Sequence, residues 1–262
     1  MKLVLAAVLL LLSSAVFASE PTTPDEYFEQ ARQKTEQMTQ VLDELLQREA
    51  DGKLDPKAET ATLQRAMAIA PQFKHDLQMA SQGGHIVATY LLANMDSKPT
   101  QTTEERKQVC ELLQKAMDAG LFAATVAYFS QCDKVYMRYD FRSAVHLKYL
   151  EQLRQRLERV DEYQDNYPLP IKRSFCFQDL RAPLKTERTL ANLQAEAKAL
   201  LLSYDQYRAE AYYILASTSF TEKGQPEKLS LDYLNQALAL GCTDTLELKD
   251  YYEKEFGGAQ AK

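Results

Sequence analysis

The sequence predicts an all-α protein built from antiparallel helical hairpins. Its composition is typical of helical proteins, because the 262 residues include only 8 glycines and no tryptophan, and Ala, Leu, Gln, Glu and Lys dominate. Residues 209–242 show the hairpin most clearly, since two amphipathic helices flank a turn at 222–226 and the second ends at Gly241. Such a hairpin cannot cover its own apolar face, so it needs neighbours of the same kind.

The first residues predict a cleaved signal peptide over 1–18. Lys2 is a short charged start, residues 3–12 are an unbroken apolar run, and residues 16–18 provide a cleavage site. An uncleaved membrane anchor is the alternative, but the run is shorter than the roughly 20 apolar residues of a comfortable span. We therefore expect a chain exported to the periplasm, or secreted as the alternative. We also expect no stable membrane span after cleavage and a flexible leader over 19–24.

The N-terminal helical block covers residues 25–163. Its first helix, 25–52, is interpreted as a cap for one end of an array, with a partner-binding coiled-coil segment as the alternative. A second helix runs from Asp55 to about Ala70, where Pro71 breaks it or begins the next one. Further helices are expected up to residue 83 and over 85–95, 104–120, 121–132 and 141–163.

The four cysteines predict disulfide bonds, because their number is even and the chain is expected to be exported. Cys110 and Cys132 each lie roughly ten residues from the turn of one tight helical hairpin, so they could face each other across it. This pairing leaves Cys176 with Cys242, or leaves both free.

Arginines and acids are interleaved near the end of the predicted helix 141–163. Arg156 and Arg159 alternate with Glu158 and Glu162, and such mixed charge is typical of a solvated face. A basic binding surface is the alternative interpretation.

Residues 164–186 are expected to form a proline-containing irregular linker, because prolines exclude a continuous helix there. The linker is the first candidate for an interaction site, and the alternative is that its aromatic side chains plug the core between two helical blocks. Tyrosines of the opening hairpin could line a concave peptide-binding face. The candidate partner-binding residues are Tyr167, Ile171, Phe175, Phe177, Tyr212 and Tyr213.

The C-terminal helical block covers residues 187–256. A helix is expected over 186–203, with a break at Tyr204 and Asp205 before the hairpin of 209–242. A final helix follows over 243–256, and residues 257–262 are expected to be a disordered tail.

The sequence contains no motif that indicates catalysis or cofactor binding. There is no GxSxG, no glycine-rich phosphate loop and no HExxH, and the chain has only three histidines. The net charge of −6 gives no overall attraction to nucleic acid or to anionic lipid. We therefore expect no catalytic residue, no cofactor, no metal site and no nucleic-acid partner.

Three predicted helices end in similar patterns at Gly83, Gly120 and Gly241, and each is followed almost at once by a new helix rich in Ala and Leu. The best-matched positions of this pattern are Ala211, Leu215, Ala216, Gly224, Ala237 and Gly241, with Lys115, Ala116 and Gly120 in a second unit. These residues resemble Sel1-like repeats, the helical hairpins related to tetratricopeptide repeats.

The resemblance implies a right-handed α-solenoid whose concave surface serves as an adaptor for other proteins. The expected function is therefore a non-enzymatic scaffold that binds a protein or peptide partner in the cell envelope. A cell-envelope hydrolase acting on a wall-related substrate is the alternative.

Overall fold

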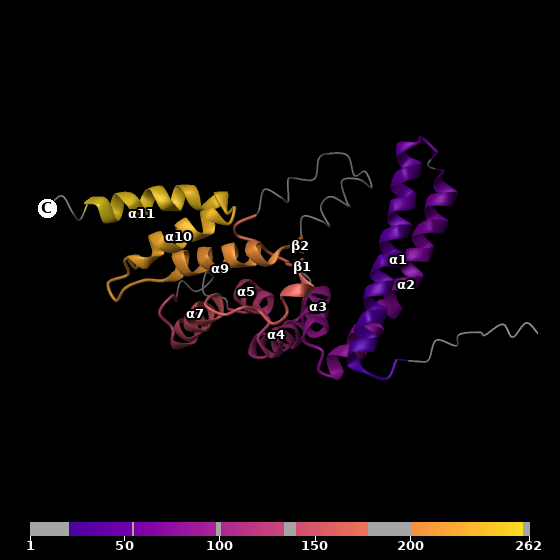
Figure 1. The fold of residues 1–262 in the computed structure, drawn as a ribbon, viewed down its shortest axis with the longest axis horizontal. Coiled ribbons are helices and arrows are strands. Elements are labelled where there is room, and N and C mark those ends of the chain that lie inside the picture. Colours follow the sequence, from indigo (N-terminus) through magenta and orange to yellow (C-terminus); the bar gives the residue numbers. More distant parts are fainter. Residues whose placement is uncertain (1–20, 54, 98–100, 134–139, 178–200, 259–262) are drawn as a thin grey trace, which may run out of the picture.

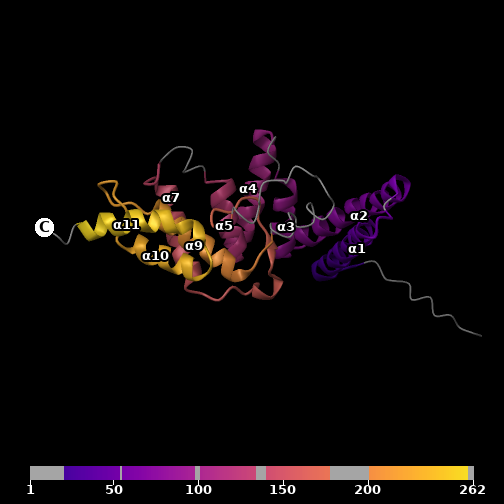
Figure 2. The same ribbon diagram turned by 90° about the horizontal axis from the view of Figure 1, so that it is seen from above.

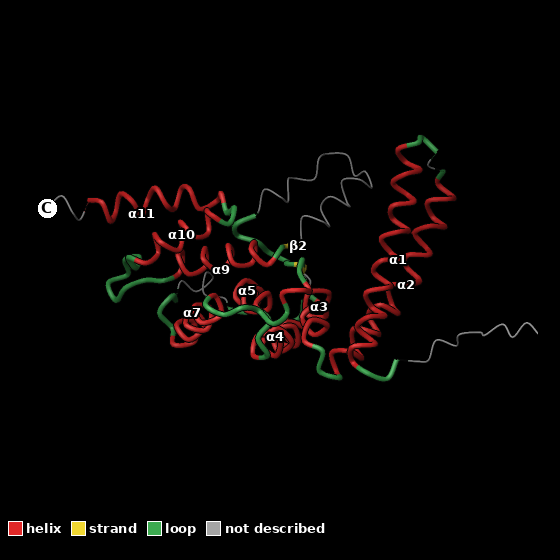
Figure 3. The backbone as a smooth tube through the Cα atoms, viewed as in Figure 1, coloured by secondary structure: helices red, strands yellow, loops and turns green. Residues whose placement is uncertain are grey.

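The computed structural model describes residues 21–53, 55–97, 101–133, 140–177 and 201–258. Most of these residues are helical, as the all-α class predicts (Figure 3). The helices follow one another along the long axis of the molecule in approximately their chain order (Figure 1). The predicted signal peptide lies outside the described residues, and no helix within the described ranges is long and apolar enough to cross a membrane.

Helices α1 (Pro24–Ala50) and α2 (Pro56–Gln82) form an antiparallel hairpin that stands apart at one end of the molecule (Figures 1 and 2). Thr23 and Glu26 begin α1 with a capping box, in which each side chain accepts the backbone N–H of the other residue. Asp55 caps α2 by accepting the backbone N–H of Lys57. The structure thus confirms the first predicted helix.

Pro71 does not break α2, so the predicted helix boundary near Ala70 is wrong. Thr62 and Asp76, on either side of Pro71, are buried, and Asp76 forms an ion pair with Lys34 of α1. The packing against α1 therefore holds the two halves of α2 in one line. Pro71 itself is exposed, so its ring lies on the surface of α2 and not in the seam with α1.

Helices α3 (Ile86–Asp96), α4 (Thr103–Asp118) and α5 (Phe122–Gln131) come next, and α3 and α5 contribute much of the main core. Cys110 of α4 and Cys132 at the end of α5 form the predicted disulfide, with their Cα atoms 5.7 Å apart. The bond ties α4 and α5 into the hairpin that the sequence predicts.

Helix α7 (Ala144–Leu157) is shorter at both ends than the predicted helix 141–163. Ser143 caps its start by accepting the backbone N–H of His146. Beyond its end, the side chain of Asp161 turns away and binds the backbone of Phe122 at the start of α5. This tertiary contact ends the helix, although the apolar period of the sequence continues.

Residues 161–177 form a segment that we call the strap. A 3-10 turn covers Gln164–Asn166, and strand β1 (Leu169–Pro170) pairs antiparallel with β2 (Leu201–Leu202), placing Leu169 opposite Leu202. The strap then continues through the interior, where Leu169 and Ile171 are buried in the main core. The strap is therefore an ordered part of the core.

The start of the C-terminal block differs from the prediction. Residues 201–202 form β2 rather than the end of a helix, and α9 (Tyr204–Thr218) begins at the position where a break was expected. Ser203 caps α9 by forming a capping box with Gln206, which explains why the helix starts there. The remaining part of the predicted helix, 186–200, lies outside the described residues.

The opening hairpin of the sequence is confirmed by α9 and α10 (Leu229–Ala239), which pack against each other. A 3-10 turn at Thr243–Thr245 leads to the final helix, α11 (Leu246–Gly258). The first two residues of the predicted tail belong to α11, and 259–262 lie outside the described residues. Cys242 forms a disulfide with Cys176, which joins the C-terminal block to the strap.

Candidate functional site

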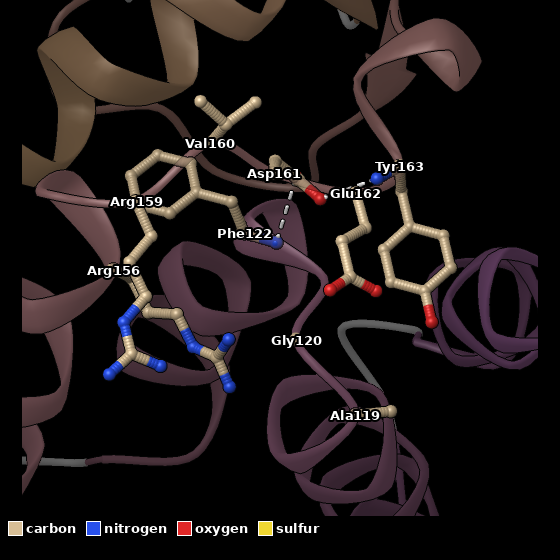
Figure 4. Close-up of a pocket in the computed structure, with 9 residues that line it drawn as sticks. All are labelled: Ala119, Gly120, Phe122, Arg156, Arg159, Val160, Asp161, Glu162 and Tyr163. Carbon is tan, nitrogen blue, oxygen red and sulfur yellow. Dashed lines mark hydrogen bonds between the residues drawn. The ribbon is translucent and has the colours of Figure 1, made fainter.

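A small pocket lies where the end of α7 meets the turn between α4 and α5 (Figure 4). Its cavity measures about 100 Å³. Its lining residues are Ala119, Gly120, Phe122, Arg156, Arg159, Val160, Asp161, Glu162 and Tyr163. Arg156 and Arg159 both line this cavity, and Figure 4 shows their side chains on one side of the view, with Glu162 and Tyr163 on the other. We call this site the arginine pocket.

The turn at Gly120 brings the backbone close to one guanidinium group. Gly120 has a φ of +107°, which L side chains rarely adopt, and a Cβ there would lie 3.1 Å from Arg156 Nη1. Arg156 Nη2 donates a hydrogen bond to the carbonyl of Met117, in the last turn of α4, at 3.2 Å. The positive charge therefore sits at the negative end of the α4 dipole, which fixes Arg156 in place.

Asp161 builds the opposite wall of the arginine pocket. Its Oδ2 accepts the backbone N–H of Phe122 at 3.1 Å and the hydroxyl of Tyr167 at 2.7 Å, and its Oδ1 accepts the backbone N–H of Tyr163 at 2.8 Å. Tyr167 in turn accepts the backbone N–H of Ala123 at 2.9 Å. Helix α5 has no side-chain cap of its own, so the strap caps it from a distance.

The tyrosines beside the pocket are held in their protonated form. Burial raises the pKa of Tyr167 well above its ordinary value, and the charge of Asp161 raises it further. Burial also raises the pKa of Tyr163, with smaller contributions from Glu162 and Asp161, while Arg156 opposes them. Both hydroxyls therefore stay protonated near neutral pH, and the Tyr167 hydroxyl donates its proton to the hydrogen bond with Asp161.

A second cavity, of about 150 Å³, shares Arg156 and Arg159 with the first. Its other lining residues are Met117, Asp118, Thr125, Gln152 and Gln155. Within the described ranges of the chain, neither Arg156 nor Arg159 forms an ion pair. The two arginines thus line both of these small polar cavities. No side chain in the described ranges neutralises their positive charges by an ion pair.

This arrangement suits the binding of an anion. A guanidinium group presents several N–H donors in a planar fork that matches the oxygens of a carboxylate or a phosphate. Asp161 is already engaged by three donors, so its role is to hold the wall of the arginine pocket.

Most of the candidate partner-binding residues of the strap lie in the core. Ile171 is 1% exposed, and Phe175 and Phe177 are each 9% exposed. Tyr167 is engaged with Asp161 and α5. Their placement matches the alternative interpretation, in which the aromatic residues of this segment plug the core between helices, and it gives no support to a direct partner contact.

Buried polar groups explain why the strap enters the interior. Glu210 of α9 accepts the backbone N–H groups of Phe175 at 2.9 Å and Cys176 at 2.9 Å, and also the hydroxyl of Ser174. The hydroxyls of Tyr90 and Tyr207 lie 2.7 Å apart, and both are within hydrogen-bond distance of the Pro170 carbonyl. The backbone of an irregular segment is thus satisfied away from water.

Tyr212 and Tyr213 of α9 are half-buried rather than exposed on an open face. Tyr212 stacks on Tyr233 with ring centroids 6.2 Å apart, and Tyr213 stacks on Phe175 at 6.0 Å. Their part in partner binding stays a prediction.

A second buried polar pair joins α5 to α7. His146 Nδ1 lies 2.7 Å from Asp133 Oδ2, and both side chains are buried. The ring of His146 packs among Phe129, Phe141 and Tyr149, so the pair ties the end of α5 to the start of α7.

The arginine pocket was only partly visible in the sequence. The sequence places Arg156 and Arg159 in a helix of mixed charge, and their spacing of three residues at its end predicts that they lie on one side. Asp161 gave no sequence signal, because its contact with the start of α5 joins residues 39 positions apart and its contact with Tyr167 joins residues 6 positions apart.

The described residues contain no group of three or more His, Cys, Asp and Glu side chains that could hold a metal ion. No family model, no curated protein and no solved structure matches the chain.

Proposed function

We propose that the protein is an exported, non-enzymatic helical scaffold of Sel1-like or tetratricopeptide-like hairpins that binds a protein or peptide partner in the periplasm. Three observations support the proposal: each helix from α1 to α5 packs against its neighbours in the chain, the signal-like residues 1–18 indicate export, and two disulfides suit an oxidising compartment. A row of hairpins offers an extended surface for binding another chain.

The observation that carries partner binding is the apolar side of the projecting α1–α2 hairpin. Leu42 and Leu63 are each 37% exposed and Met67 is 72% exposed. Glu44 and Arg65 form an ion pair across the two helices at 2.6 Å. Leu42 lies two positions from Glu44, and Leu63 and Met67 each lie two positions from Arg65. Two positions correspond to about 200° around a helix, so the three apolar side chains occupy the side of the hairpin opposite the ion pair.

An apolar patch on a projecting element is typical of a protein interaction surface. An isolated two-helix hairpin buries only the seam between its helices, so a partner chain that covers the apolar side would also stabilise the hairpin. The partner we propose is therefore a protein segment with its own apolar face, such as an amphipathic helix.

Site-specific photocrosslinking in the cell envelope tests the proposal. A photoreactive residue replaces Met67 on the apolar side, and in the control it replaces Gln37, which lies seven residues before Glu44 and so on the charged side. We expect a discrete adduct with a second protein from position 67 and none from position 37. Met67→Glu should abolish recovery of that partner, and Gln37→Glu should not.

Equal labelling from both positions, or none from either, would contradict the proposal. An adduct consisting of two copies of this chain would show that the apolar side serves self-association, which the proposal does not predict.

A further inference from the structure

We propose that Arg156 and Arg159 bind a carboxylate group, supplied by the free C terminus of a peptide or by a small organic acid. The inference deepens the proposed function, and it rests on that function only for the source of the carboxylate. The site itself stands on the geometry of the arginine pocket.

The first argument is the charge of the pair. Arg156 and Arg159 line the same two small cavities, and like charges repel each other unless a counter-charge lies between them or beside them. No ion pair to either arginine occurs among the residues that the structure describes, although Asp118, Asp161 and Glu162 line the same two cavities. A bound anion would supply the missing counter-charge.

The second argument is preorganisation. The Met117 carbonyl holds Arg156, and Gly120 leaves the room that the guanidinium group needs. Helix capping accounts for Arg156 but not for Arg159, whose side chain makes no hydrogen bond with the described residues. Arg159 is exposed, so its guanidinium donors are accessible to a ligand.

The third argument selects a carboxylate over a phosphate. A phosphate carries up to two negative charges near neutral pH, and the neighbouring carboxylates of Asp118 and Glu162 would repel it more strongly than they repel a single charge. The carboxylates of the same two acids can accept hydrogen bonds from the amide N–H groups that precede a peptide C terminus. The side-chain amides of Gln152 and Gln155 can both donate to and accept from these amide groups.

Binding of a defined probe to the full chain tests the site. The probe is an N-acetylated dipeptide with a free C-terminal carboxylate, and its matched control is the same dipeptide with a C-terminal amide. Inorganic phosphate and acetate form two further arms, because they separate the choice of anion and the need for a peptide. Titration calorimetry or the side-chain NMR signals of arginine report saturable binding.

Arg159→Gln is the decisive variant, and Arg32→Gln is its control, since Arg32 lies on the exposed surface of α1. We expect Arg159→Gln to melt like the parent protein while its affinity for the free acid falls at least about tenfold, because a charge-assisted hydrogen bond is lost. Arg156→Gln should lose both binding and stability. Arg32→Gln should change neither.

Equal binding of the acid and the amide, unchanged binding by Arg159→Gln, or no saturable binding of the acid would overturn the proposal. Tighter binding of phosphate than of the dipeptide or acetate would overturn the choice of a carboxylate. Binding of acetate as tight as that of the dipeptide would assign the source to a small acid. Probe binding without an adduct from position 67 would reject the scaffold proposal alone, and an adduct without probe binding would reject the carboxylate site alone.

Discussion

Replacing Asp161 with asparagine should destabilise the protein strongly, whereas the same kind of change at the next residue, Glu162→Gln, should not. Asp161 accepts three hydrogen bonds, from Phe122, Tyr163 and Tyr167, and is 6% exposed. Glu162 is exposed and lines the same pocket. Both substitutions keep the shape of the side chain and remove one negative charge, so the comparison isolates the hydrogen bonds.

The magnitude follows from what an amide can replace. With its oxygen at the Oδ2 position, the asparagine side chain of the Asp161→Asn variant would keep the bonds from Phe122 and Tyr167 as weaker, uncharged ones. Its NH₂ group would then face the Tyr163 N–H, so the Tyr163 N–H would lose its acceptor. Weakening two charge-assisted bonds and leaving this partly buried N–H without an acceptor costs about 2–4 kcal/mol of unfolding free energy. In a chain of this size, that corresponds to a drop in Tm of roughly 5–15 °C.

Urea and thermal denaturation, followed by far-ultraviolet circular dichroism, measure the difference directly. We expect Glu162→Gln to stay within about 0.5 kcal/mol of the parent protein. If Asp161→Asn and Glu162→Gln have the same stability, then the strap does not cap α5 in the way the structure indicates.

Three further predictions concern pH and the disulfides. Burial lowers the pKa of His85, with Asp25 opposing, and His85 Nδ1 accepts the Ala88 N–H, so protonation of His85 removes the cap of α3. Because the folded pKa lies below the unfolded value of about 6.5, this contribution to stability should be complete above that pH and fall below it. The difference in Tm between about pH 7.5 and about pH 5.5 should therefore be smaller in His85→Asn than in the parent protein. Burial raises the pKa of Tyr252 to about 12, above its unfolded value of about 10. Its contribution to the free energy of unfolding should therefore be complete below about pH 10 and disappear as the pH approaches about 12. In urea titrations, Tyr252→Phe should lose stability with rising pH less steeply than the parent protein, by up to about 1.4 kcal/mol per pH unit. Cys176 and Cys242 are 66 residues apart, and Cys110 and Cys132 are 22 residues apart. Replacing the first pair with serine should therefore lower the free energy of unfolding by about 1 kcal/mol more than replacing the second pair. Equal losses in urea denaturation would contradict the loop-entropy explanation.

Local signals predicted most of the helices correctly. The apolar spacing of the helices and the turn at Gly120 act within a few residues of the chain, so they could be read from the sequence. The disulfide between Cys110 and Cys132 followed from the same local hairpin.

The errors have a tertiary cause. Packing against α1 carries α2 through Pro71, and the contact of Asp161 with α5 ends α7 early. The irregular course of residues 164–177 and the burial of their aromatic side chains agree with the interpretation that this segment plugs the core. Its contact with Glu210 spans about 35 residues, so the sequence does not show it. For the same reason, the sequence alone does not indicate the pocket beside Arg156 and Arg159.

The strap has a consequence for how the chain unfolds. A simple row of hairpins loses its units one by one, because each unit contacts only its neighbours. The strap instead links α5, α3 and α9 through Asp161, Pro170 and Glu210, so these helices should unfold together as one cooperative unit. The α1–α2 hairpin makes none of these contacts within the described residues, and it should therefore exchange its backbone amide hydrogens faster than the strapped body does.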